Sequence, residues 1–551
     1  NYLWQKTDNP WQLMKLQNQY QYRSGVVIAS TGLGKTEMGL LWSGRDKTFY
    51  TLPVRTSVNA MFDRLVNYFG RDNVGLLHSD AFGKIICGME EKYDTDDALV
   101  YYDTARCLSF PITVSTADQI FTAALKFFGF EKIYATLAYS KIIIDEIQAY
   151  SPHTSAIVVQ ALREIQNLGG KYLVLTATLP PMIRDYLEYD FYIEHVPNLK
   201  KHRIKLVAEE ITCQVVQLVE RYKGKKILIV CNTVEKARSI YKILNDHCPW
   251  LQKFDPDKNC LEHREYPLVL FHSRFTSWDK RMREHAVLDK NFIGILVATQ
   301  VVEVSLDIDF DLLLTEIAPL EVLIQRMGRI YRRYKEDGFY CPMEPNVYIF
   351  TEKPSGINTI YESDIISRTL SLFQAEILSE HDKLDMVNDL YSKDSLKNTA
   401  YLTNFLSALE ILGNFTEKSK DKAQQLFREI DSIYVLPCSL LESPVKNLFL
   451  LQSLHLPEGI TLRSALAELK FENRSQKMLG YEMIKDFLVP VRAWSLQKAR
   501  VVDLSSFVGR DIFRGIPVVE GEYNKNEGFI YNLYNRDNRT SLRGDIQDNI
   551  L

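Results

Sequence analysis

The sequence predicts an α/β fold with two successive parallel sheets, each covered by helices on both faces. Between residues 25 and 350, short runs of β-branched and aliphatic residues alternate with longer amphipathic stretches, as buried parallel strands alternate with helices. The runs end in polar or small residues, and ligands bind at those ends in such sheets. At 551 residues, the chain is also too long for a single hydrophobic core.

The strands can be placed in order along the chain. Five are predicted for the first domain: 26–29, 48–52, 112–115, 141–144 and 172–175. A charged connection near residues 195–210 leads to five strands of the second domain: 227–231, 268–271, 294–298, 311–314 and 347–350. Beyond residue 353, strand-like runs thin out, and the segments 364–378 and 403–412 have helical spacing. The predicted division is 1–200 and 201–352 for the two α/β domains, 353–424 for a helical linker and 425–551 for a small mixed domain.

Composition excludes several classes of protein. No stretch reaches the roughly 18–20 apolar residues of a membrane span, so we expect no membrane association. The eight cysteines include no CxxC pair, which argues against a zinc ribbon and a disulfide framework and favours a reducing, cytoplasmic location. The chain has 66 basic and 70 acidic residues, for a net charge of −4. Any nucleic-acid binding must therefore come from a local groove.

The segment from Ala29 to Thr36 has the pattern of a phosphate-binding loop. It follows a predicted strand, precedes an amphipathic stretch and departs from the usual motif only by Ala29 in place of the first glycine. In such loops, glycines let backbone N–H groups surround phosphate oxygens, a lysine neutralises charge and a hydroxyl holds magnesium. The predicted nucleotide-binding residues are Ser30, Thr31, Gly32, Leu33, Gly34, Lys35 and Thr36, with Thr36 also a magnesium ligand.

Two further groups of polar residues follow predicted strands. Asp145 and Glu146 come after an apolar run; in a phosphate-loop enzyme the first carboxylate orders magnesium and the second positions or deprotonates the attacking water. Alone, such a pair is as often a solvated cap, but with the loop upstream it indicates an ATPase. Thr176 and Thr178 can relay the nucleotide state through hydrogen bonds, although a helix cap is the commoner role of such residues.

The segment 325–333 is strongly basic. Because residues three and four apart share a helix face, we expect Arg326, Arg329 and either Arg332 or Arg333 on one side of a helix. An arginine supplied by a partner domain can stabilise charge on the transferring phosphoryl group. A solvated basic helix is the alternative that this segment alone allows.

Taken in order, these motifs resemble the superfamily two helicases, in which ATP lies between two RecA-like domains. The resemblance covers residues 10–335, from Gln12 to the basic segment. Within that superfamily, the segments 271–275, 298–309, 317–319 and 323–326 are similar to the CRISPR-associated helicase-nuclease of type I interference systems. The resemblance therefore implies two tandem RecA-like domains, a helical linker and a small C-terminal domain.

The resemblance also implies roles for individual residues. Gln12 would read the adenine, Asp145 would hold Mg²⁺ together with Thr36, and Asp307 would face both nucleotide and strand. The implied catalytic residues are Lys35, Asp145, Glu146, Gln325, Arg326 and Arg329, with Thr176 and Thr178 coupling ATP hydrolysis to strand movement. The implied nucleic-acid path consists of Pro53, Arg55, Thr56, Thr116, His272, Ser273, Arg274 and Thr299.

The chain departs from the family pattern in two ways. Gln148 stands where most relatives have histidine, so this coupling residue still forms hydrogen bonds but cannot titrate near neutral pH. The family usually also carries an HD-type metal nuclease, and the only His-Asp dipeptide here, His381-Asp382, is expected to lie on a helix surface. We therefore expect the nuclease to be a separate polypeptide or to be absent from this sequence.

The function implied is an ATP- and Mg²⁺-dependent translocase and helicase acting on single-stranded DNA. Its expected partners are the RNA-guided surveillance complex (Cascade) and a separate HD nuclease subunit. Two alternatives stay open: an RNA helicase of the same superfamily, which would share every ATP-site residue, and a nucleotide-gated clamp that binds nucleic acid without moving along it.

Overall fold

The computed structural model divides the chain into two compact units. The first unit comprises Asn1–Gln214 and Val302–Glu429, and the second comprises Val215–Val301 and Ile430–Leu551. The residues described are 11–30, 32–88, 95–197, 199–257, 266–303, 306–332, 342–412, 416–417, 419–428, 432–469, 473–492, 501–508, 513 and 515–531. The four-part division made from the sequence stays a prediction.

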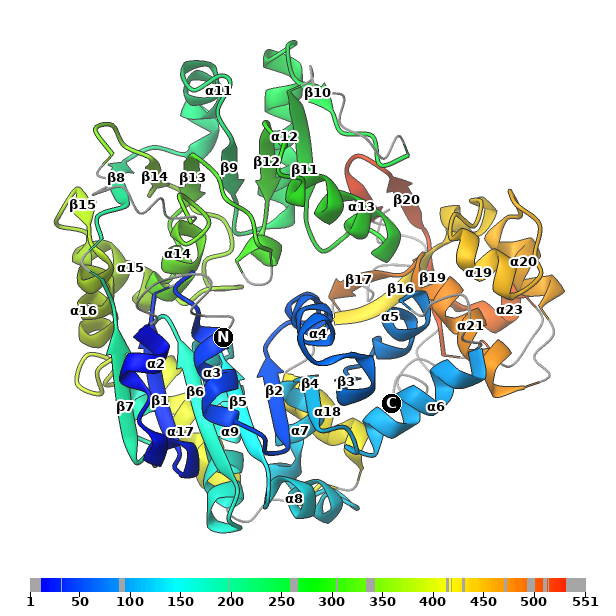
Figure 1. Ribbon diagram of the computed structural model, residues 1–551. Helices are drawn as coiled ribbons and strands as arrows, with labels where there is room; N and C mark the ends of the chain where they lie inside the picture. Colours follow the sequence, from blue (N-terminus) through cyan, green and yellow to red (C-terminus); the bar gives the residue numbers. More distant parts are fainter. Residues whose placement is uncertain are drawn as a thin grey trace. The chain divides into compact units, whose positions relative to one another are not determined.

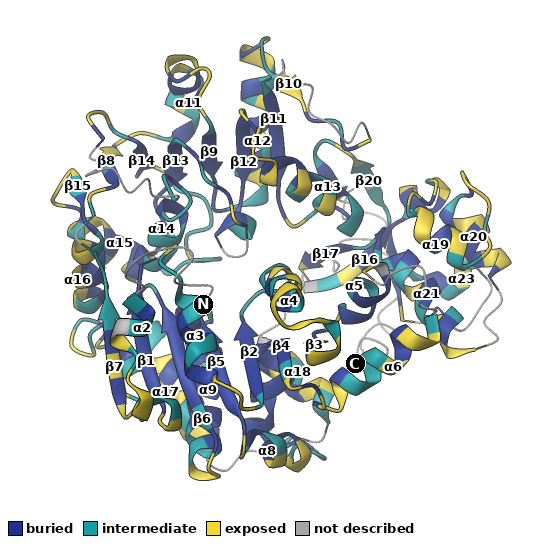
Figure 2. Ribbon diagram, viewed as in Figure 1, coloured by how far each residue is buried: buried dark blue, intermediate teal, exposed yellow. Residues whose placement is uncertain are grey.

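A seven-stranded parallel sheet forms the centre of the first unit. Its order is β3-β4-β2-β5-β6-β1-β7. The strands are β1 Gly25–Ala29, β2 Thr48–Leu52, β3 Val74–Leu77, β4 Ile112–Thr116, β5 Lys141–Asp145, β6 Lys171–Thr176 and β7 Phe191–His195. Figure 2 shows β1, β2 and β5 buried along their length and β6 buried beyond its first residue, because helices cover both faces. The five predicted strands are confirmed, whereas β3 and β7 were missed.

Helices α3 and α9 pack against β6, and α4 packs against β2, β3 and β4. The N-terminus of α9 is fixed by Ser151, whose hydroxyl accepts a hydrogen bond from the Thr154 N–H, and by Pro152 in the first turn. The helices and short 3₁₀ segments around this sheet are α2 Trp11–Lys15, η1 Asn18–Tyr22, α3 Lys35–Ser43, α4 Arg55–Phe69, η2 Arg71–Asn73, α5 Ala81–Cys87, α6 Thr95–Arg106, α7 Ala117–Ile120, η3 Phe121–Leu125, α8 Glu131–Leu137, η4 Ile147–Ala149, α9 Pro152–Asn167 and α10 Pro181–Arg184.

The strands of the second sheet are divided between the units, and each portion is described with its own unit. In the first unit, β13 Leu312–Glu316 pairs in parallel with β14 Val347–Phe350, which pairs in parallel with β8 His202–Val207. Strand β15 Ile377–Leu378 pairs with β8 in antiparallel fashion. The prediction of a charged connection near residues 195–210 was therefore wrong, because β8 lies within it: His202 and Ile204 are buried and Arg203 and Lys205 are more exposed, the alternation of a strand.

The remaining helices of the first unit are α14 Leu320–Met327, α15 Ser363–Leu372, α16 Glu380–Leu390, α17 Ala400–Leu412 and α18 Lys420–Arg428. The segment 364–378 was predicted to be helical, but α15 ends at Leu372 and β15 follows. Helix α17 packs against α9, and the two lie side by side in Figure 1. Residues beyond the second sheet thus help to cover the first one.

In the second unit, β10, β11, β12 and β9 pair in parallel in that order. This portion contains α11 Ile211–Arg221, which begins in the first unit, β9 Ile227–Val230, α12 Val234–His247, β10 Gln252–Lys253, β11 Pro267–Phe271, α13 Ser277–Leu288, β12 Ile295–Ala298 and η5 Gln300–Val302. The three strands predicted for this region are confirmed to within a residue of their ends, whereas the short β10 was missed.

The C-terminal part of the second unit is a small mixed domain, as the fold class predicted. Its four-stranded sheet has the order β17-β16-β19-β18, and a hairpin, β20–β21, follows. Its elements are β16 Ser432–Pro437, η6 Cys438–Glu442, α19 Leu448–Ser453, α20 Leu462–Glu468, α21 Arg474–Lys485, β17 Val489–Arg492, β18 Val501–Asp503, α23 Leu504–Val508, β19 Pro517–Val519, β20 Gly521–Asn524 and β21 Gly528–Tyr531. Phe529 of the hairpin packs into a core with Val435, Val489 and Val519.

Within the part of the chain that the structure describes, helices long and apolar enough to cross a bilayer are absent.

Candidate functional site

The loop between β1 and α3 has the backbone that a phosphate-binding loop requires. Gly32 and Gly34 adopt φ values of 85° and 81°, in the left-handed region that favours glycine. Gly34 then precedes the first turn of α3, and its carbonyl accepts a hydrogen bond from the Met38 N–H at 3.2 Å. The loop therefore presents the N-terminus of α3, where backbone N–H groups are free to bind anions. Thr31, one of the predicted loop residues, lies outside the described residues.

Gln12 is buried against this loop. Its Nε2 donates to the carbonyls of Leu33 and Gly34 at 2.9 and 3.2 Å. Trp11 donates from its indole N–H to the same Leu33 carbonyl at 2.7 Å and stacks on His195 of β7, with ring centroids 4.5 Å apart. The predicted adenine-reading residue thus lies at the phosphate loop, where Trp11 binds the same Leu33 carbonyl.

Lys35 and Glu146 form an ion pair at the loop. The Lys35 ammonium lies 2.9 Å from Oε1 of Glu146 and 3.2 Å from the carbonyl of Ala29. Burial favours a raised pKa for Glu146, but the Lys35 ammonium and the Gln148 amide outweigh burial and lower that pKa. Glu146 therefore stays ionised. Its carboxylate pairs with the Lys35 ammonium, the group that is predicted to bind phosphates.

Asp145 lies beside this pair, at the carboxyl end of β5. Its Oδ2 accepts a hydrogen bond from the Tyr50 hydroxyl at 2.9 Å, whereas its buried Oδ1 has no hydrogen-bond partner among the described residues. Burial, together with the adjacent Glu146 carboxylate, raises the pKa of Asp145 to about 6. An orphaned carboxylate oxygen is unfavourable unless a cation or water satisfies it.

The side chains around Asp145 fit a magnesium site. Thr36 is buried at the start of α3 and hydrogen bonds to Tyr50, which also binds Asp145. Mg²⁺ prefers oxygen ligands, and the Thr36 hydroxyl and the Asp145 Oδ1 supply two of them. Tyr50 was missed in the sequence, although its place on β2, the neighbour of β5 in the sheet, makes it a natural partner for Asp145.

A hydrogen-bonded network joins Glu146 to the end of β6. The Gln148 amide donates to Oε2 of Glu146, and the Thr176 hydroxyl lies 2.6 Å from Oε1 of Gln148. The same hydroxyl lies 2.6 Å from the Thr178 carbonyl and accepts from the Thr178 N–H at 3.1 Å. The three predicted coupling residues are thus brought together in one network that ends on Glu146.

The sequence predicted that the arginines of the basic segment share one face of a helix, and this prediction was wrong. Helix α14 ends at Met327, Ile330 forms a β-bridge with Phe310, and Tyr331 has a φ of 49°. Arg329 and Arg332 therefore lie beyond the helix, while Arg333 is outside the described residues. The 3.6-residue period failed here because Gly328 caps the helix and the following residues pair with Phe310 instead.

Arg326 is completely buried within its own domain. Its guanidinium binds Glu303 at 2.8–2.9 Å, the Thr315 hydroxyl at 2.8 Å and the Glu316 carbonyl at 3.2 Å. Glu303 was not predicted from the sequence. In this conformation the Arg326 guanidinium is committed to protein atoms and holds α14 against β13.

Arg329 is also saturated by protein acceptors. It donates to the carbonyls of Val302, Leu306 and Glu303, at 2.9, 2.8 and 2.5 Å. Burial lowers its pKa to about 9, with a further lowering from Arg332, while the Glu146 carboxylate acts in the opposite direction. Because the Glu146 carboxylate acts on the pKa of Arg329, the two side chains are close enough to interact electrostatically.

Gln325 and Asp307 lie near the arginines but make fewer contacts. Gln325 is half-buried on α14, and the exposed Asp307 carboxylate lies 3.4 Å from Nε of Arg332. The backbone N–H of Arg332 donates to Asp309 at 2.8 Å. Asp307 thus pairs with the basic segment, and its role at the nucleotide stays a prediction.

The nucleic-acid residues predicted in the first domain gather at neighbouring strand ends. Pro53, Arg55 and Thr56 follow β2, and Thr116 ends β4, where it pairs in register with Leu52. Arg55 forms an ion pair with Asp80. The buried Thr116 hydroxyl has no hydrogen-bond partner among the described residues. These positions are juxtaposed, and their nucleic-acid role stays a prediction.

The nucleic-acid residues predicted in the second unit gather in the same way. His272, Ser273 and Arg274 follow β11, and Thr299 follows β12, its N–H donating to the Phe271 carbonyl at 3.3 Å. His272 is buried and stacks on the Phe275 ring, and burial lowers its pKa well below the usual value, with Arg274 adding to the effect. His272 is therefore neutral, while Arg274 pairs with Glu235 at 2.5 Å.

The hairpin β20–β21 packs on these residues, a contact that the sequence did not reveal. The Phe529 N–H donates to the Arg274 carbonyl at 2.9 Å, and a Cβ on Gly528 would come within 2.8 Å of the His272 ring. Glu527 at the turn pairs with Arg238 and Lys242 of α12, each at 3.1 Å. An acidic turn thus covers part of the predicted nucleic-acid path.

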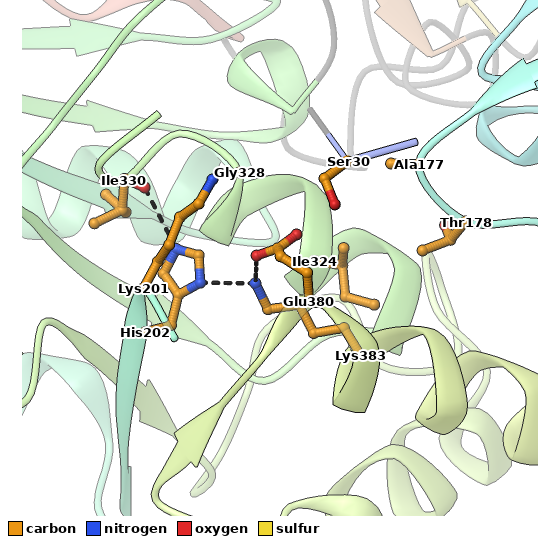
Figure 3. A pocket seen from close by; sticks show the side chains of 10 residues that line it. All are labelled: Ser30, Ala177, Thr178, Lys201, His202, Ile324, Gly328, Ile330, Glu380 and Lys383. Atoms are coloured by element: carbon orange, nitrogen blue, oxygen red, sulfur yellow. Dashed lines mark hydrogen bonds and ion pairs between the residues drawn. The ribbon is translucent and has the colours of Figure 1, made fainter. Parts of the chain in front are cut away.

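A pocket opens between the phosphate loop and α16. It has a volume of about 440 Å³, including its open mouth, and Figure 3 shows the residues of the first unit that line it. Its lining residues are Ser30, Ala177, Thr178, Lys201, His202, Ile324, Gly328, Ile330, Glu380 and Lys383. The four charged or titratable members come from β8, α16 and the residue before β8, all outside the motifs recognised in the sequence.

Two family models match the chain. Residues 9–186, which carry the phosphate loop and Asp145-Glu146, match DEAD/DEAH box helicase. Residues 223–335 match CRISPR-associated nuclease/helicase Cas3, C-terminal. The chain resembles the Cas3 helicases. The resemblance predicted from the motifs is thus confirmed.

Individual relatives agree with these matches. The chain is 30% identical to a CRISPR-associated nuclease/helicase Cas3 of Methanothermobacter thermautotrophicus, over 80% of this chain and 55% of that protein. It is 26% identical to the CRISPR-associated endonuclease/helicase Cas3 of Escherichia coli, over 58% of this chain and 42% of that protein. The chain thus spans about half the length of the curated relatives it matches.

Solved structures share the fold. The crystal structure of T. fusca Cas3 superposes with a TM-score of 0.72 at 19% identity, covering 96% of this chain and 71% of that one. A chain from the structure "CRISPR RNA-guided surveillance complex, pre-nicking" superposes with a TM-score of 0.63 at 19% identity, covering 95% of this chain and 70% of that one. The predicted fold class, two RecA-like domains with a linker and a small C-terminal domain, is confirmed.

Proposed function

We propose that this protein is an ATP-driven motor that translocates along single-stranded DNA and unwinds target DNA in type I CRISPR interference. The observation that carries the proposal is the constellation at the phosphate loop: Lys35 on Glu146, with Asp145 beside them and its Oδ1 free to bind a cation. The similarity to Cas3 proteins along most of the chain supports the DNA-unwinding role.

The site residues suggest how ATP would be hydrolysed. The phosphates would take the Lys35 ammonium from Glu146, because a triphosphate carries more negative charge than one carboxylate. Glu146, held through its other oxygen by Gln148, would then accept a proton from the attacking water. The water oxygen bonds to the γ-phosphorus as the bond to the β-phosphate oxygen breaks, leaving ADP and phosphate.

Thr36 and Asp145 would hold the magnesium ion that neutralises phosphate charge when bound. Gln12 and the loop N–H groups would hold the remaining parts of the nucleotide. Arg329 would sense the γ-phosphate only after exchanging its carbonyl partners, since each of its nitrogens is already engaged. ATP binding would therefore rearrange the segment around Arg329.

The strand would follow the residues at the ends of β2, β4, β11 and β12. Arg55 and Arg274 supply cations there, and Thr56, Thr116 and Thr299 supply hydroxyls, a set suited to phosphates rather than base edges. Contacts of this kind carry little sequence preference, as a translocase requires. We further propose recruitment by an RNA-guided surveillance complex such as Cascade, since a structure of such a complex shares this fold, and cleavage by a separate HD nuclease subunit.

The test is ATP hydrolysis stimulated by single-stranded DNA. We expect Lys35→Ala and Asp145→Asn to lower kcat at least ~100-fold, because each removes charge stabilisation of the transition state. Binding of a labelled oligo-dT in the absence of ATP should change less than ~3-fold, since neither residue lies on the proposed strand path. Lys132→Ala, at an exposed lysine of α8, is the matched control. Normal ATP turnover in either variant would sink the proposal.

The same assay separates the alternatives. Oligo-dT should stimulate ATP hydrolysis more than oligo-rU of equal length, whereas an RNA helicase would show the opposite order. The wild-type protein should unwind a duplex that carries a 3′ single-stranded tail. A clamp would bind that duplex and hydrolyse ATP, but the strands would stay paired.

A further inference from the structure

Two charged residues of α16 form a buried chain of contacts with β8. The Lys383 ammonium lies 2.5 Å from Oε1 of Glu380 and 2.7 Å from Nδ1 of His202, and all three side chains face the pocket in Figure 3. His202 and Lys383 are each no more than 3% exposed. Burying such charges is unfavourable unless each one is paired, so this arrangement is demanding to maintain.

The contacts determine the tautomer of His202. An ammonium group can only donate, so Nδ1 of His202 must accept from Lys383. Burial lowers the pKa of His202 well below its usual value, and Lys383 lowers it further, so the ring is neutral. Nε2 therefore carries the hydrogen, and it points at the Ile330 carbonyl at 3.4 Å.

Glu380 stabilises the positive end of this chain. Burial would raise the pKa of Glu380, but the Lys383 and Lys201 ammonium groups outweigh burial and lower the pKa to about 2. Glu380 is thus ionised at neutral pH and pairs with the Lys383 ammonium. Glu380, Lys383 and His202 form one relay that ends on the backbone of Ile330.

Ile330 belongs to the segment that carries the arginines. Its neighbour Arg329 accepts a backbone hydrogen bond from Phe310 at 2.9 Å on one side, and the relay contacts Ile330 on the other. The backbone of Arg332 passes close to the phosphate loop, its carbonyl 3.5 Å from the position of a Cβ on Gly32. Ser30 and Thr178 border the same pocket as the relay.

We propose that Lys383, acting through His202, is a positioning residue that holds the arginine segment over the phosphate loop. The inference rests on the proposed ATPase function and extends it: a helix beyond the second sheet takes part in ATP hydrolysis. Lys383 and His202 do not touch the nucleotide in this proposal. They fix where Arg329 and Arg332 stand when the phosphates arrive.

The first test replaces the charged pair together. The double variant Glu380→Gln/Lys383→Met removes the relay while leaving the net charge of the site unchanged. We expect kcat of DNA-stimulated ATP hydrolysis to fall at least ~10-fold, because small misplacements of catalytic groups have effects of this size. KM for ATP should change less than ~3-fold, since Gln12 and the loop are untouched. His381→Ala, at an exposed position of α16, is the control.

The second test leaves the buried charges in place. His202→Gln retains an N–H donor toward Ile330, whereas His202→Leu does not. We expect His202→Gln to keep more than about a third of wild-type kcat and His202→Leu to lose at least ~10-fold. Equal kcat values for the two variants, or a double variant with wild-type kcat, would overturn the proposal. Lys35→Ala in the same assay shows separately whether ATP hydrolysis depends on the phosphate loop at all.

Discussion

Arg326 and Arg329 belong to the same sequence motif, but their surroundings differ. Arg326 is fully buried on Glu303 and on β13, whereas Arg329 binds three backbone carbonyls and lies within electrostatic reach of Glu146. Removing one partner of a buried ion pair typically destabilises a protein by about 3–5 kcal/mol. Loss of activity on changing Arg326 would therefore be ambiguous, and Arg329 is the cleaner probe of the catalytic step.

Glu321 on α14 offers a pH-dependent test of burial. Its Oε2 is buried with no hydrogen-bond partner among the described residues, and burial, together with Glu303, raises its pKa from 4.5 to about 7. Because the folded pKa exceeds the unfolded one, Glu321 lowers stability progressively as pH rises from about 4.5 to 7. A shift of this size corresponds to at most ~3 kcal/mol.

We therefore expect Glu321→Gln to raise the thermal unfolding midpoint at pH 8 by a few degrees and to leave it nearly unchanged at pH 5. Differential scanning calorimetry at the two pH values measures both shifts. An equal shift at both would mean that the carboxylate charge is not the cause.

Some site residues could be predicted from the sequence and others could not. Lys35, Asp145 and Glu146 are recognisable because the chemistry requires them in a fixed order along the chain. Tyr50 and Glu303 are not, because their importance arises from contacts with residues 95 and 23 positions away in the sequence. The pKa of Asp145 likewise depends on burial, which no local pattern reveals.

At the scale of elements, the predicted strands were those whose sequences are apolar throughout. Strand β8 was missed because it alternates buried and charged residues, and β3 because Gly75 interrupts a short run. The segment after α14 was mispredicted because a cap and a β-bridge replaced the expected helix. Periodicity predicts central elements well, whereas partly exposed strands and chain reversals depend on tertiary pairing.

The β20–β21 hairpin leads to a prediction about nucleic-acid affinity. Glu527 pairs with Arg238 and Lys242 beside the His272–Arg274 segment, so it occupies cations that a DNA phosphate can bind. We expect Glu527→Gln to tighten binding of oligo-dT about 3- to 10-fold at low salt, by freeing two positive charges. Fluorescence anisotropy measures the change.

Glu522→Gln, on the same hairpin but with its carboxylate exposed, is the control. Weaker binding by Glu527→Gln would show instead that the acidic turn supports the strand path by holding α12 in place.

At the scale of the whole molecule, binding depends on where charge lies and not on its total. The chain has a net charge of −4, yet Arg55 and Arg274 lie at strand ends of the two units. If four phosphates are contacted, affinity for single strands should fall about 50-fold between 50 and 200 mM salt.

Titration of oligo-dT at four salt concentrations gives this slope directly. The double variant Arg55→Gln/Arg274→Gln should flatten it by one to two contacts, whereas an unchanged slope would place the strand elsewhere.

The Lys35–Glu146 ion pair has a consequence for the resting protein. With no nucleotide bound, the two charges cancel, so the loop can stay buried without an external anion. In the proposed ATPase, arriving ATP would compete with the Glu146 carboxylate for Lys35, and the return of that carboxylate to Lys35 would favour phosphate release. The same pairing would keep Glu146, the proposed general base, engaged until ATP displaces it from Lys35. Hydrolysis would therefore begin only after ATP has taken Lys35 from Glu146, so the substrate itself would release the base that acts on the water.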